Sequence, residues 1–281
     1  MRSNFRFASG APVRGDAIWG MCYRPFMLQT LVHETEQKKA RLDSLRPLAT
    51  AAIAQLQKHY DVELTYTSNA IEGNILTLRE TAEVIEHGIT VGGKSLHDHL
   101  EAVDHYQALQ WMRQIASSAA SVGEATICQL HRRIVARSQS EIAGSYSQFP
   151  RRIAGSSVIF PNPAKIPQLM QAFGEGLAGL PASAASAFEA HFRLTAIHPF
   201  SDGNGRTARL LMNLLLIRAV YPPVAVRPVD RSRYLAVLER ASLAEDLQPF
   251  QIFMHERLSA TLDDYLSAVQ EALPPPASKG P

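Results

Sequence analysis

One short stretch of this sequence, residues 198–209 (HPFSDGNGRTAR), holds side chains that could carry out chemistry on a phosphate group. His198 supplies a base whose ordinary pKa is near neutral, so it can take a proton from an attacking hydroxyl. Asp202 could hold a Mg²⁺ ion between its carboxylate and phosphate oxygens. Arg206 and Arg209 are one helical turn apart, so both guanidinium groups can reach the same polyanion.

The glycines of this stretch favour a loop that opens a helix. Asp-Gly and Asn-Gly pairs also occur in β-hairpin turns, but the flanking segments, SAFEAHFRLTAI and TARLLMNLLLIRA, have helical periodicity. The first N–H groups of a helix have no partner within the helix and attract anions. Gly203 and Gly205 would let these amides, together with that of Asn204, close around a phosphate.

Each of these side chains has a commoner explanation when it is taken alone. A histidine at a helix end is more often a cap or a solvated side chain, and two arginines on one helix more often form a solvated face. We interpret Pro199 and Phe200 as anchors that hold the loop against the core. The coincidence of several residue types at fixed spacing nevertheless favours a functional site.

The composition describes an ordinary globular protein without a global charge bias. The chain has 281 residues, 46% of them hydrophobic, and a formal net charge of +2. We therefore expect neither nucleic acid nor a membrane as a partner, and a homodimer stays open. Cys22 and Cys128 lie in no metal-ligand spacing, and no apolar run has the length of a signal peptide or a membrane span. We expect a cytoplasmic protein.

Apolar residues recur at three- and four-residue spacing through most of the chain, which predicts an all-α fold. Thr77 and Glu80 form a capping-box pattern in front of LRETAEVIEH, and Gly88 is placed to end that helix. Ser95 can cap the next helix. These punctuation residues predict where the helices begin and end.

Residues 149–163 (FPRRIAGSSVIFPNP) interrupt the helical pattern. Short β-favouring runs flank Ala-Gly-Ser-Ser, which predicts a small β-hairpin on the surface of the helical body. We find no internal repeat and no long linker. We expect an N-terminal arm and helical extension over residues 1–60, extended up to about residue 22, then a main domain over residues 61–270 and a disordered tail over residues 271–281.

HPFSDGNGRTAR matches, at every specified position, the signature of Fic-domain protein adenylyltransferases, His-Pro-Phe-x-Asp/Glu-Gly-Asn-Gly-Arg-x-x-Arg. The resemblance runs from about residue 60 to residue 265 and includes GKSLHDHLEA, RRIAGSSVIFPNP and RLLMNLLLIRAVYPPV. It implies an all-α, Fic-type helical bundle with a small β-hairpin flap. Residues 61–270 would be the catalytic domain, including an inhibitory helix. Family members transfer AMP from Mg·ATP to a Ser, Thr or Tyr hydroxyl of a target protein.

The resemblance assigns a role to each motif residue. His198 would deprotonate the target hydroxyl, and Asp202 would hold Mg²⁺ on the α- and β-phosphates. The phosphates would be cradled by Gly203, Asn204 and Gly205, the leaving pyrophosphate supported by Arg206 and the γ-phosphate gripped by Arg209. The flap, residues 149–163, would bind an extended target segment as an added strand.

The nucleotide base is the part of the substrate for which the resemblance is incomplete. Many family members place an Asn and a Gly-Asp pair after the motif to contact the nucleotide, whereas this chain has ASLAEDL. Ser242 and Glu245 therefore leave base recognition open. Tyr234 is the remaining candidate for stacking on adenine.

A second motif is TSNAIEGN, residues 67–74, which predicts a one-turn helix with Ser68 as its N-cap and Gly-Asn as its stop. Glu72 lies at the C-terminal end, where the helix dipole disfavours a carboxylate, so it needs a cation or open solvent. The stretch also matches the family's inhibitory motif, Ser/Thr-x-x-x-Glu-Gly/Asn. The resemblance implies that Glu72 pairs with Arg209 and blocks productive placement of the γ-phosphate.

A competing nucleotide signal lies in residues 88–95 (GITVGGKS), which satisfy the P-loop pattern. We reject it because a P-loop follows a buried strand of a parallel sheet, whereas a capped amphipathic helix precedes this segment. Lys94 and Ser95 then belong to a linker and a cap. His97 and His99 lie two apart on a helix, on different faces, so we do not expect a metal pair.

The sequence thus predicts an autoinhibited protein adenylyltransferase that uses ATP and Mg²⁺. Two alternatives share the fold: an enzyme that removes AMP, with Glu72 orienting water, and one that transfers another nucleotide or phosphocholine. A third alternative is a non-catalytic nucleotide-sensing module, which needs the loop and the arginines only. The presence of both His198 and Asp202 favours an enzyme.

Overall fold

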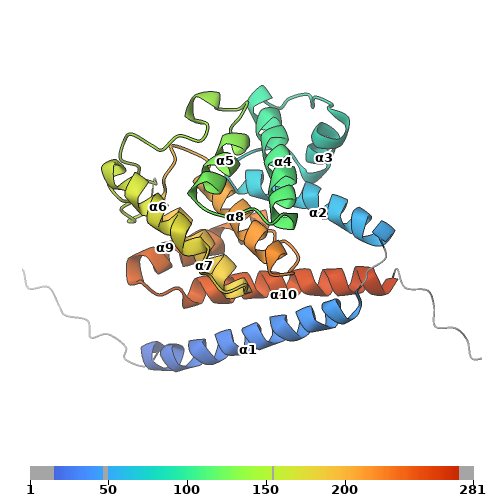
Figure 1. Cartoon of the computed structure of the whole chain (residues 1–281), viewed down its shortest axis with the longest axis vertical. Helices are drawn as coiled ribbons and strands as arrows, with labels where there is room; N and C mark the ends of the chain where they lie inside the picture. The colour runs from blue at the N-terminus through green and yellow to red at the C-terminus, as the bar shows by residue number, and fades with distance from the viewer. Residues whose placement is uncertain (1–15, 47–49, 154, 272–281) are drawn as a thin grey trace, which may run out of the picture.

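The computed structural model describes residues 16–46, 50–153 and 155–271, and this part of the chain is all-α (Figure 1). Its ten α-helices are α1 (Asp16–Ser44), α2 (Thr50–Ile71), α3 (Leu78–His87), α4 (Leu96–Ser117), α5 (Glu124–Ile134), α6 (Ile166–Leu177), α7 (Ala184–Ile197), α8 (Asn204–Arg218), α9 (Arg231–Ala244) and α10 (Gln248–Glu271). The described residues form no strand, only an isolated bridge between Tyr146 and Phe200. The predicted all-α class is confirmed.

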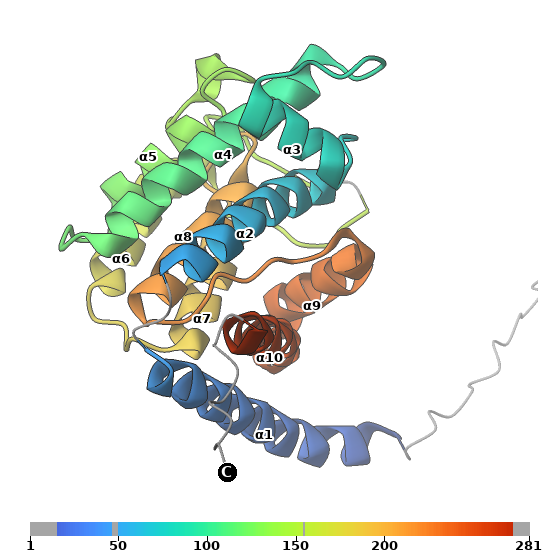
Figure 2. The ribbon, with the colours of Figure 1, turned by 90° about the vertical axis from the view of Figure 1, so that its right-hand side faces the viewer.

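α8 runs through the middle of the bundle and packs against α7, α4 and α5 (Figure 2). Leu210, Leu211 and Leu214 are almost completely buried. A helix that is apolar on several faces belongs in a core, which explains the central place of α8. Its first turn differs, because the buried residues there include Asn204 and Arg206. The motif therefore lies at the polar start of the central helix.

α1 lies along the outside of α10 (Figures 1 and 2). Lys38 of α1 donates to the Asp263 carboxylate of α10 at 2.6 Å. We expected an extended chain up to about residue 22, but α1 begins at Asp16, so that prediction was wrong for these residues. A helix that is already nucleated extends at low cost, which outweighed the mixed local composition. The first 15 residues and the C-terminal tail lie outside the described residues.

The predicted helix ends around α3 and α4 are confirmed. Thr77 Oγ1 accepts the Glu80 N–H at 3.2 Å, and the Glu80 carboxylate accepts the Thr77 N–H at 2.7 Å, which is a complete capping box. Gly88 ends α3 with a positive φ of 66°. Ser95 caps α4 by accepting an N–H of its first turn. Local sequence patterns were sufficient here because each cap joins residues three or four apart.

α2 differs from the prediction at its start and agrees at its end. Ser68 lies inside this 22-residue helix, so the predicted one-turn helix with Ser68 as N-cap was wrong. The preceding residues continue the helical spacing, and nothing breaks the chain before Ser68. The stop is as predicted: Gly73 has φ 103°, and the Asn74 N–H donates to the Asn69 carbonyl at 3.1 Å. Our domain boundary after residue 60 lies within α2 and stays a prediction.

The flap, residues 149–163, makes the predicted turn but not the predicted paired strands. Gly155 has φ 79°, and the Ser156 N–H donates to the Ile153 carbonyl at 3.1 Å. No described residue of the flap belongs to a strand. Its polar groups bond to another element instead, since Ser156 Oγ and the next backbone N–H donate to the Glu239 carboxylate of α9 at 2.7 and 3.0 Å.

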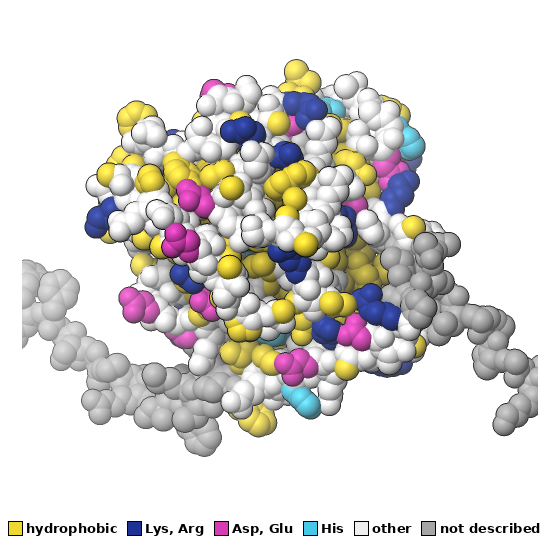
Figure 3. Space-filling view, in the orientation of Figure 1, with side chains coloured by type: hydrophobic (Ala, Val, Ile, Leu, Met, Phe, Trp, Pro, Cys, Tyr) yellow, Lys and Arg dark blue, Asp and Glu magenta, His cyan; other side chains and the backbone are white. Residues whose placement is uncertain are grey.

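Basic and acidic side chains of the described residues are interspersed on the face shown in Figure 3. Many of the charges on this part of the chain pair locally, as Lys39 does with Asp43 at 2.6 Å. Exposed pairs of this kind contribute little to stability.

None of the described helices has both the length and the apolar character that crossing a bilayer demands.

Candidate active site

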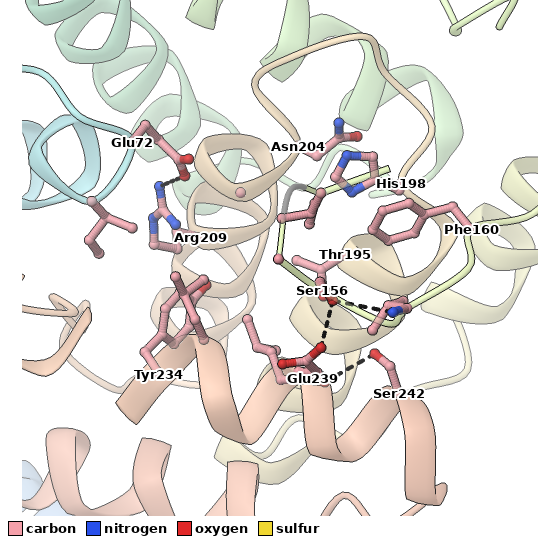
Figure 4. Close-up of a pocket in the computed structure, with 17 residues that line it drawn as sticks. Glu72, Ser156, Phe160, Thr195, His198, Asn204, Arg209, Tyr234, Glu239 and Ser242 are labelled. Atoms are coloured by element: carbon pink, nitrogen blue, oxygen red, sulfur yellow. Dashed lines mark hydrogen bonds and ion pairs between the residues drawn. The ribbon is translucent and has the colours of Figure 1, made fainter. Parts of the chain in front are cut away.

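A cavity of about 290 Å³ opens where α2, α7, α8, α9 and the flap meet (Figure 4). Its polar lining includes Glu72, Ser156, His198, Asn204, Arg209, Glu239 and Ser242, and its apolar lining includes Ile71, Ile153, Val158, Leu235 and Leu238. An apolar slot beside convergent charged groups suits a ligand that has a flat ring and an anionic tail.

His198 follows α7 and enters the cavity from a strained backbone position. Its φ of 51° lies in the left-handed region, and its N–H donates to the Leu194 carbonyl at 3.0 Å. The ring stacks on Phe160 of the flap, with ring centres 4.0 Å apart (Figure 4). Burial lowers the pKa of His198, so the imidazole is neutral at neutral pH. A neutral ring in this position can act as a base.

The Gly-Asn-Gly turn is held from inside by the asparagine. Asn204 Oδ1 accepts the Phe200 N–H at 2.9 Å, and Asn204 Nδ2 donates to the Phe200 carbonyl at 2.8 Å. Gly203 has φ 72°, which favours glycine. A Cβ at Gly205 would collide with the Glu72 carboxylate. The side chain of Asn204 is thus used to close the loop, which leaves its backbone amide as its contribution to anion binding.

Asp202 presents a half-exposed carboxylate beside this turn. Its Oδ1 accepts the Gly203 N–H at 2.6 Å, and its Oδ2 accepts from Gln139 Nε2 at 2.5 Å and lies 3.3 Å from Arg206 Nη2. Burial alone would raise the pKa of Asp202, but the Arg206 charge and these hydrogen bonds lower it. The ionised carboxylate fits a Mg²⁺ ion that is held by one protein ligand together with substrate phosphates. The described residues contain no cluster of three or more side chains able to form a self-sufficient metal site.

His131 of α5 fixes the backbone of the loop and was missed by sequence reasoning. Its Nδ1 accepts the Gly144 N–H at 3.0 Å, so its other nitrogen carries the proton and donates to the Asp202 carbonyl at 3.0 Å. The ring stacks on Phe200 with centres 3.7 Å apart. Burial lowers the pKa of His131 to about 4, which keeps this tautomer neutral. No local pattern could reveal a contact between residues 71 apart.

Arg206 is 1% exposed and is held by a carboxylate that sequence reasoning also missed. Its Nη1 donates to Glu101 Oε1 of α4 at 2.7 Å. The other Glu101 oxygen accepts from Asn74 Nδ2 at 3.0 Å. Glu101 lies in the stretch GKSLHDHLEA that carries the family resemblance, but nothing in its own spacing indicated a partner.

Glu72 and Arg209 meet in the cavity although they lie 137 residues apart (Figure 4). Arg209 Nη2 donates to Glu72 Oε1 at 2.7 Å, and the same guanidinium bonds to Ser68 Oγ and to the Ser68 carbonyl at 3.0 and 2.9 Å. Arg209 is 4% exposed. The predicted contact is therefore present, and Ser68 contributes to it as a partner of the arginine.

Tyr234 lies at the base of the cavity and is 1% exposed. Its hydroxyl forms a hydrogen bond with His191 Nε2 at 2.8 Å. Its stacking on adenine stays a prediction.

The other residues considered for base recognition lie at the end of α9. Ser242 lines the cavity, whereas Glu245 ends α9 outside it. Glu239 is the carboxylate that does face the cavity from α9, and the sequence gave no reason to select it.

Known proteins resemble this chain in sequence as well as in motif. Residues 121–216 match the model of the Fic/DOC family. The chain is 33% identical over 245 residues to the protein adenylyltransferase Fic of Nematostella vectensis, covering 85% of this chain and 56% of that protein. This chain contains a Fic domain. The protein adenylyltransferase Fic of Drosophila willistoni is also 33% identical, over 240 residues, and 47% of it is covered. The chain spans about half the length of the curated relatives it matches.

Solved Fic structures share the architecture. A Fic domain containing signaling protein from Bacteroides thetaiotaomicron superposes with a TM-score of 0.79 at 27% identity, covering 85% of this chain and 97% of that one. Fic-1 from C. elegans superposes with a TM-score of 0.77 at 26% identity, covering 91% of this chain and 76% of that one. The helical arrangement around the motif is therefore shared with these two Fic structures.

The Fic domain does not enclose its cavity alone. The family match includes the motif loop and His131, but Glu72 precedes it and Tyr234 and Glu239 follow it. The flanking helices α2 and α9 thus supply two walls of the cavity. A ligand that fills this cavity would contact residues from outside the matched range.

The P-loop-like segment, residues 88–95, has structural partners only. Lys94 Nζ donates to the Ile75 carbonyl at 2.7 Å, and Ser95 is the cap of α4. His99 accepts the Val91 N–H at 2.8 Å, so one of its ring nitrogens is already used. Neither this segment nor the two histidines that follow it, His97 and His99, line the cavity of the Fic domain.

Proposed function

We propose that this chain is an autoinhibited protein adenylyltransferase, which transfers AMP from Mg·ATP to a Ser, Thr or Tyr hydroxyl of a target protein. The observation that carries the proposal is the Glu72–Arg209 ion pair, at 2.7 Å, in the same cavity as His198. In this pair the Glu72 carboxylate binds the Arg209 guanidinium, which we assign to the γ-phosphate. The names of the curated relatives support AMP transfer as the reaction.

The proposed reaction is an in-line displacement at the α-phosphorus of ATP. The target oxygen bonds to phosphorus while its proton passes to His198, and the bond to the β-phosphate breaks to release pyrophosphate. The backbone amides at the start of α8 and the Arg206 guanidinium stabilise the charge that develops on the phosphates. Mg²⁺ held by Asp202 would supply further charge neutralisation.

Inhibition follows from competition for one guanidinium. Arg209 is buried, so it cannot turn outward to bind a γ-phosphate while keeping its contact with Glu72. A planar guanidinium presents a fixed set of donors, which a carboxylate and a phosphate cannot share fully. We infer that ATP binds to the wild-type protein in a pose that leaves its α-phosphorus out of line.

The flap is the proposed docking site for the target. Ile153 and Ile159 are 50% and 75% exposed on it, and the backbone between them makes no strand pairing among the described residues. An extended target segment could pair with this backbone and bring its hydroxyl toward His198. Phe160, stacked on His198, links the flap to the base.

Removal of AMP is a second candidate that one observation favours. Glu72 uses Oε1 for Arg209, while its Oε2 makes no hydrogen bond with a described residue, and the side chain is 36% exposed. The second oxygen could therefore orient a water toward a phosphorus atom. In that reaction Glu72 would be a catalytic residue rather than an inhibitory one.

One experiment tests both candidates. Wild type, Glu72→Gly and the double variant Glu72→Gly with His198→Ala are incubated with labelled ATP and a cell lysate. We expect label on protein hydroxyls with Glu72→Gly only, identified by mass spectrometry. The labelled protein is then purified and returned to the wild type. Absence of label with Glu72→Gly contradicts the proposal, and release of AMP by the wild type supports the second candidate.

A further inference from the structure

Gln139 contacts the carboxylate that we assign to Mg²⁺. Its Nε2 donates to Asp202 Oδ2 at 2.5 Å, and Arg206 Nη2 lies 3.3 Å from the same oxygen. The other oxygen of Asp202 accepts the Gly203 N–H at 2.6 Å. A carboxylate oxygen has about two lone-pair sites, so both sites on Oδ2 are in use. A cation can bind this oxygen only when one donor leaves.

Of the two donors on Oδ2, Gln139 is the one that can leave. Arg206 is 1% exposed, and its other terminal nitrogen is held by Glu101 at 2.7 Å. Gln139 is only partly buried, and its amide makes no second hydrogen bond with a described residue. The terminal torsion of a glutamine is soft, so the amide can turn away at low cost.

The backbone of Gln139 is fixed, so its side chain starts from a set position beside the carboxylate. Asp104 is completely buried and accepts the backbone N–H groups of Arg137 and Ser138 at 2.7 and 2.9 Å. The N–H of Gln139 itself donates to the Val135 carbonyl at 3.0 Å. The segment that carries Gln139 is therefore anchored to α4 and to the end of α5.

We propose that Gln139 is a positioning residue that occupies Oδ2 of the Asp202 carboxylate, competes there with a cation, and so lowers the affinity of the site for Mg²⁺. The inference rests on the proposed function in one respect, the role of Asp202 as the metal ligand. The amide orients the carboxylate before the metal arrives and is displaced by it. Because the Asp202 carboxylate is half-exposed, loss of this hydrogen bond corresponds to about a three- to tenfold change in metal affinity.

Titration calorimetry of ADP binding to the full chain, with and without Mg²⁺, tests the inference. ADP has no γ-phosphate, so the Glu72–Arg209 pair does not interfere. The ratio of the two affinities measures the gain due to the metal. We expect Gln139→Leu and Gln139→Ala to raise this ratio about three- to tenfold and to leave the affinity for metal-free ADP unchanged. Mn²⁺ binding followed by electron paramagnetic resonance gives a second readout.

Two controls make the result specific. Gln139→Leu keeps most of the side-chain volume, so agreement with Gln139→Ala excludes a packing effect. Gln148→Ala removes an exposed glutamine whose amide donates to the Tyr146 carbonyl at 3.3 Å, away from Asp202. It should leave the metal-dependent ratio at the wild-type value.

The outcomes separate this inference from the proposed function. An unchanged ratio in both Gln139 variants would mean that the contact is only structural, and a reduced ratio that the amide assists the metal; either result overturns the inference. Asp202→Asn is measured in parallel. If it abolishes the metal-dependent gain while Gln139→Leu changes nothing, only the role of Gln139 fails. If Asp202→Asn retains the full gain, the metal assignment in the proposed function fails as well.

Discussion

The motif loop, residues 198–209, and the flap, residues 149–163, border the same cavity but are held in opposite ways. In the loop, Asn204 bonds to the backbone of the buried Phe200 through both of its polar atoms, and His131 bonds to the backbone carbonyl of Asp202. The backbone of the loop is thus held by side chains from the loop itself and from α5.

The flap has few such contacts. Its described part is closed by one turn and attached to α9 through Glu239, and it leaves Ile153 and Ile159 half or more exposed. The contrast fits the two tasks that we propose for these segments. Groups that act on a reacting phosphate need fixed positions, whereas a surface that accepts an extended segment must keep backbone groups unpaired.

The largest expected effect comes from removing the base of the motif loop. In the Glu72→Gly background, we expect His198→Ala to lower the rate of AMP transfer by about 10²–10⁴-fold, because nothing then takes the hydroxyl proton. The affinity for ADP should stay close to that of the parent, since the loop itself is intact. Single-turnover labelling and calorimetry measure the two quantities.

The pH profile sharpens this prediction. Burial lowers the pKa of His198 below its ordinary value of about 6.5, so the neutral base persists at lower pH. The transfer rate should therefore begin to fall only below that value. Transfer at the parent rate in His198→Ala would show that another group is the base.

The second effect concerns the ion pair between Glu72, directly after α2, and Arg209 of α8. We expect Glu72→Gly to raise autolabelling at least about tenfold over wild type, because the guanidinium of Arg209 is released for the γ-phosphate. The double variant Glu72→Gly with Arg209→Ala should lose this gain. All three proteins are compared at equal concentration by labelled ATP. If Glu72→Gly is no more active than wild type, α2 does not inhibit this Fic domain.

The third effect is a dependence of stability on pH, which tests how His131 supports the loop. Burial lowers the pKa of His131 to about 4, so between this value and about 6.5 the folded state binds fewer protons than the unfolded state. Its contribution to stability is complete above about pH 6.5 and falls toward pH 4, by up to about 1.4 kcal/mol per pH unit. Melting temperatures from pH 7.5 to pH 5 measure the slope.

The control for this prediction is His131→Gln, which has no group that titrates in this range. Other buried histidines, His105, His191 and His255, also have lowered pKa values, through burial, and contribute to the wild-type slope. The difference between wild type and His131→Gln therefore isolates His131. Identical slopes would mean that His131 has the same pKa in the folded and unfolded states, because protonation of Nδ1 would otherwise break its hydrogen bond with the Gly144 N–H.

The smallest expected effects come from one substitution in the motif loop and one in the flap, which compare the two regions directly. Asn204→Ala leaves the buried N–H and carbonyl of Phe200 without partners, which should cost about 1–3 kcal/mol and lower Tm by about 2–4 °C for each of these kcal/mol. Ser156→Ala removes one flap contact at the surface and should change stability by less than about 0.5 kcal/mol. Thermal melts and hydrogen exchange of the flap amides separate the cases. Equal Tm shifts would contradict the contrast between loop and flap.

The sequence predicted best the features whose partners are close in the chain. The cap residues Thr77, Gly88 and Ser95 end or begin helices as expected. Sequence reasoning failed where distant elements compete for the same groups. Ser68 has the chemistry of a cap but is the partner of Arg209 inside α2, and the flap has β-favouring residues but bonds to Glu239.

What the sequence determined by itself is the chemistry of the motif loop. A base, a carboxylate, a glycine turn and two arginines within residues 198–209 are brought together by the geometry of one helix start, whatever surrounds it. Their types and spacing were sufficient to indicate a phosphate site. The resemblance to Fic proteins rests on the same residues.

Only the tertiary structure decided which groups hold and restrain that chemistry. The motif is contacted by Glu101 of α4, His131 of α5 and Gln139 after α5. Glu72, directly after α2, contacts Arg209. Contacts across such separations depend on the packing of whole helices, which many side chains determine together and no short pattern encodes. A buried charge must find a partner, but the sequence alone cannot say which carboxylate the fold will bring to it.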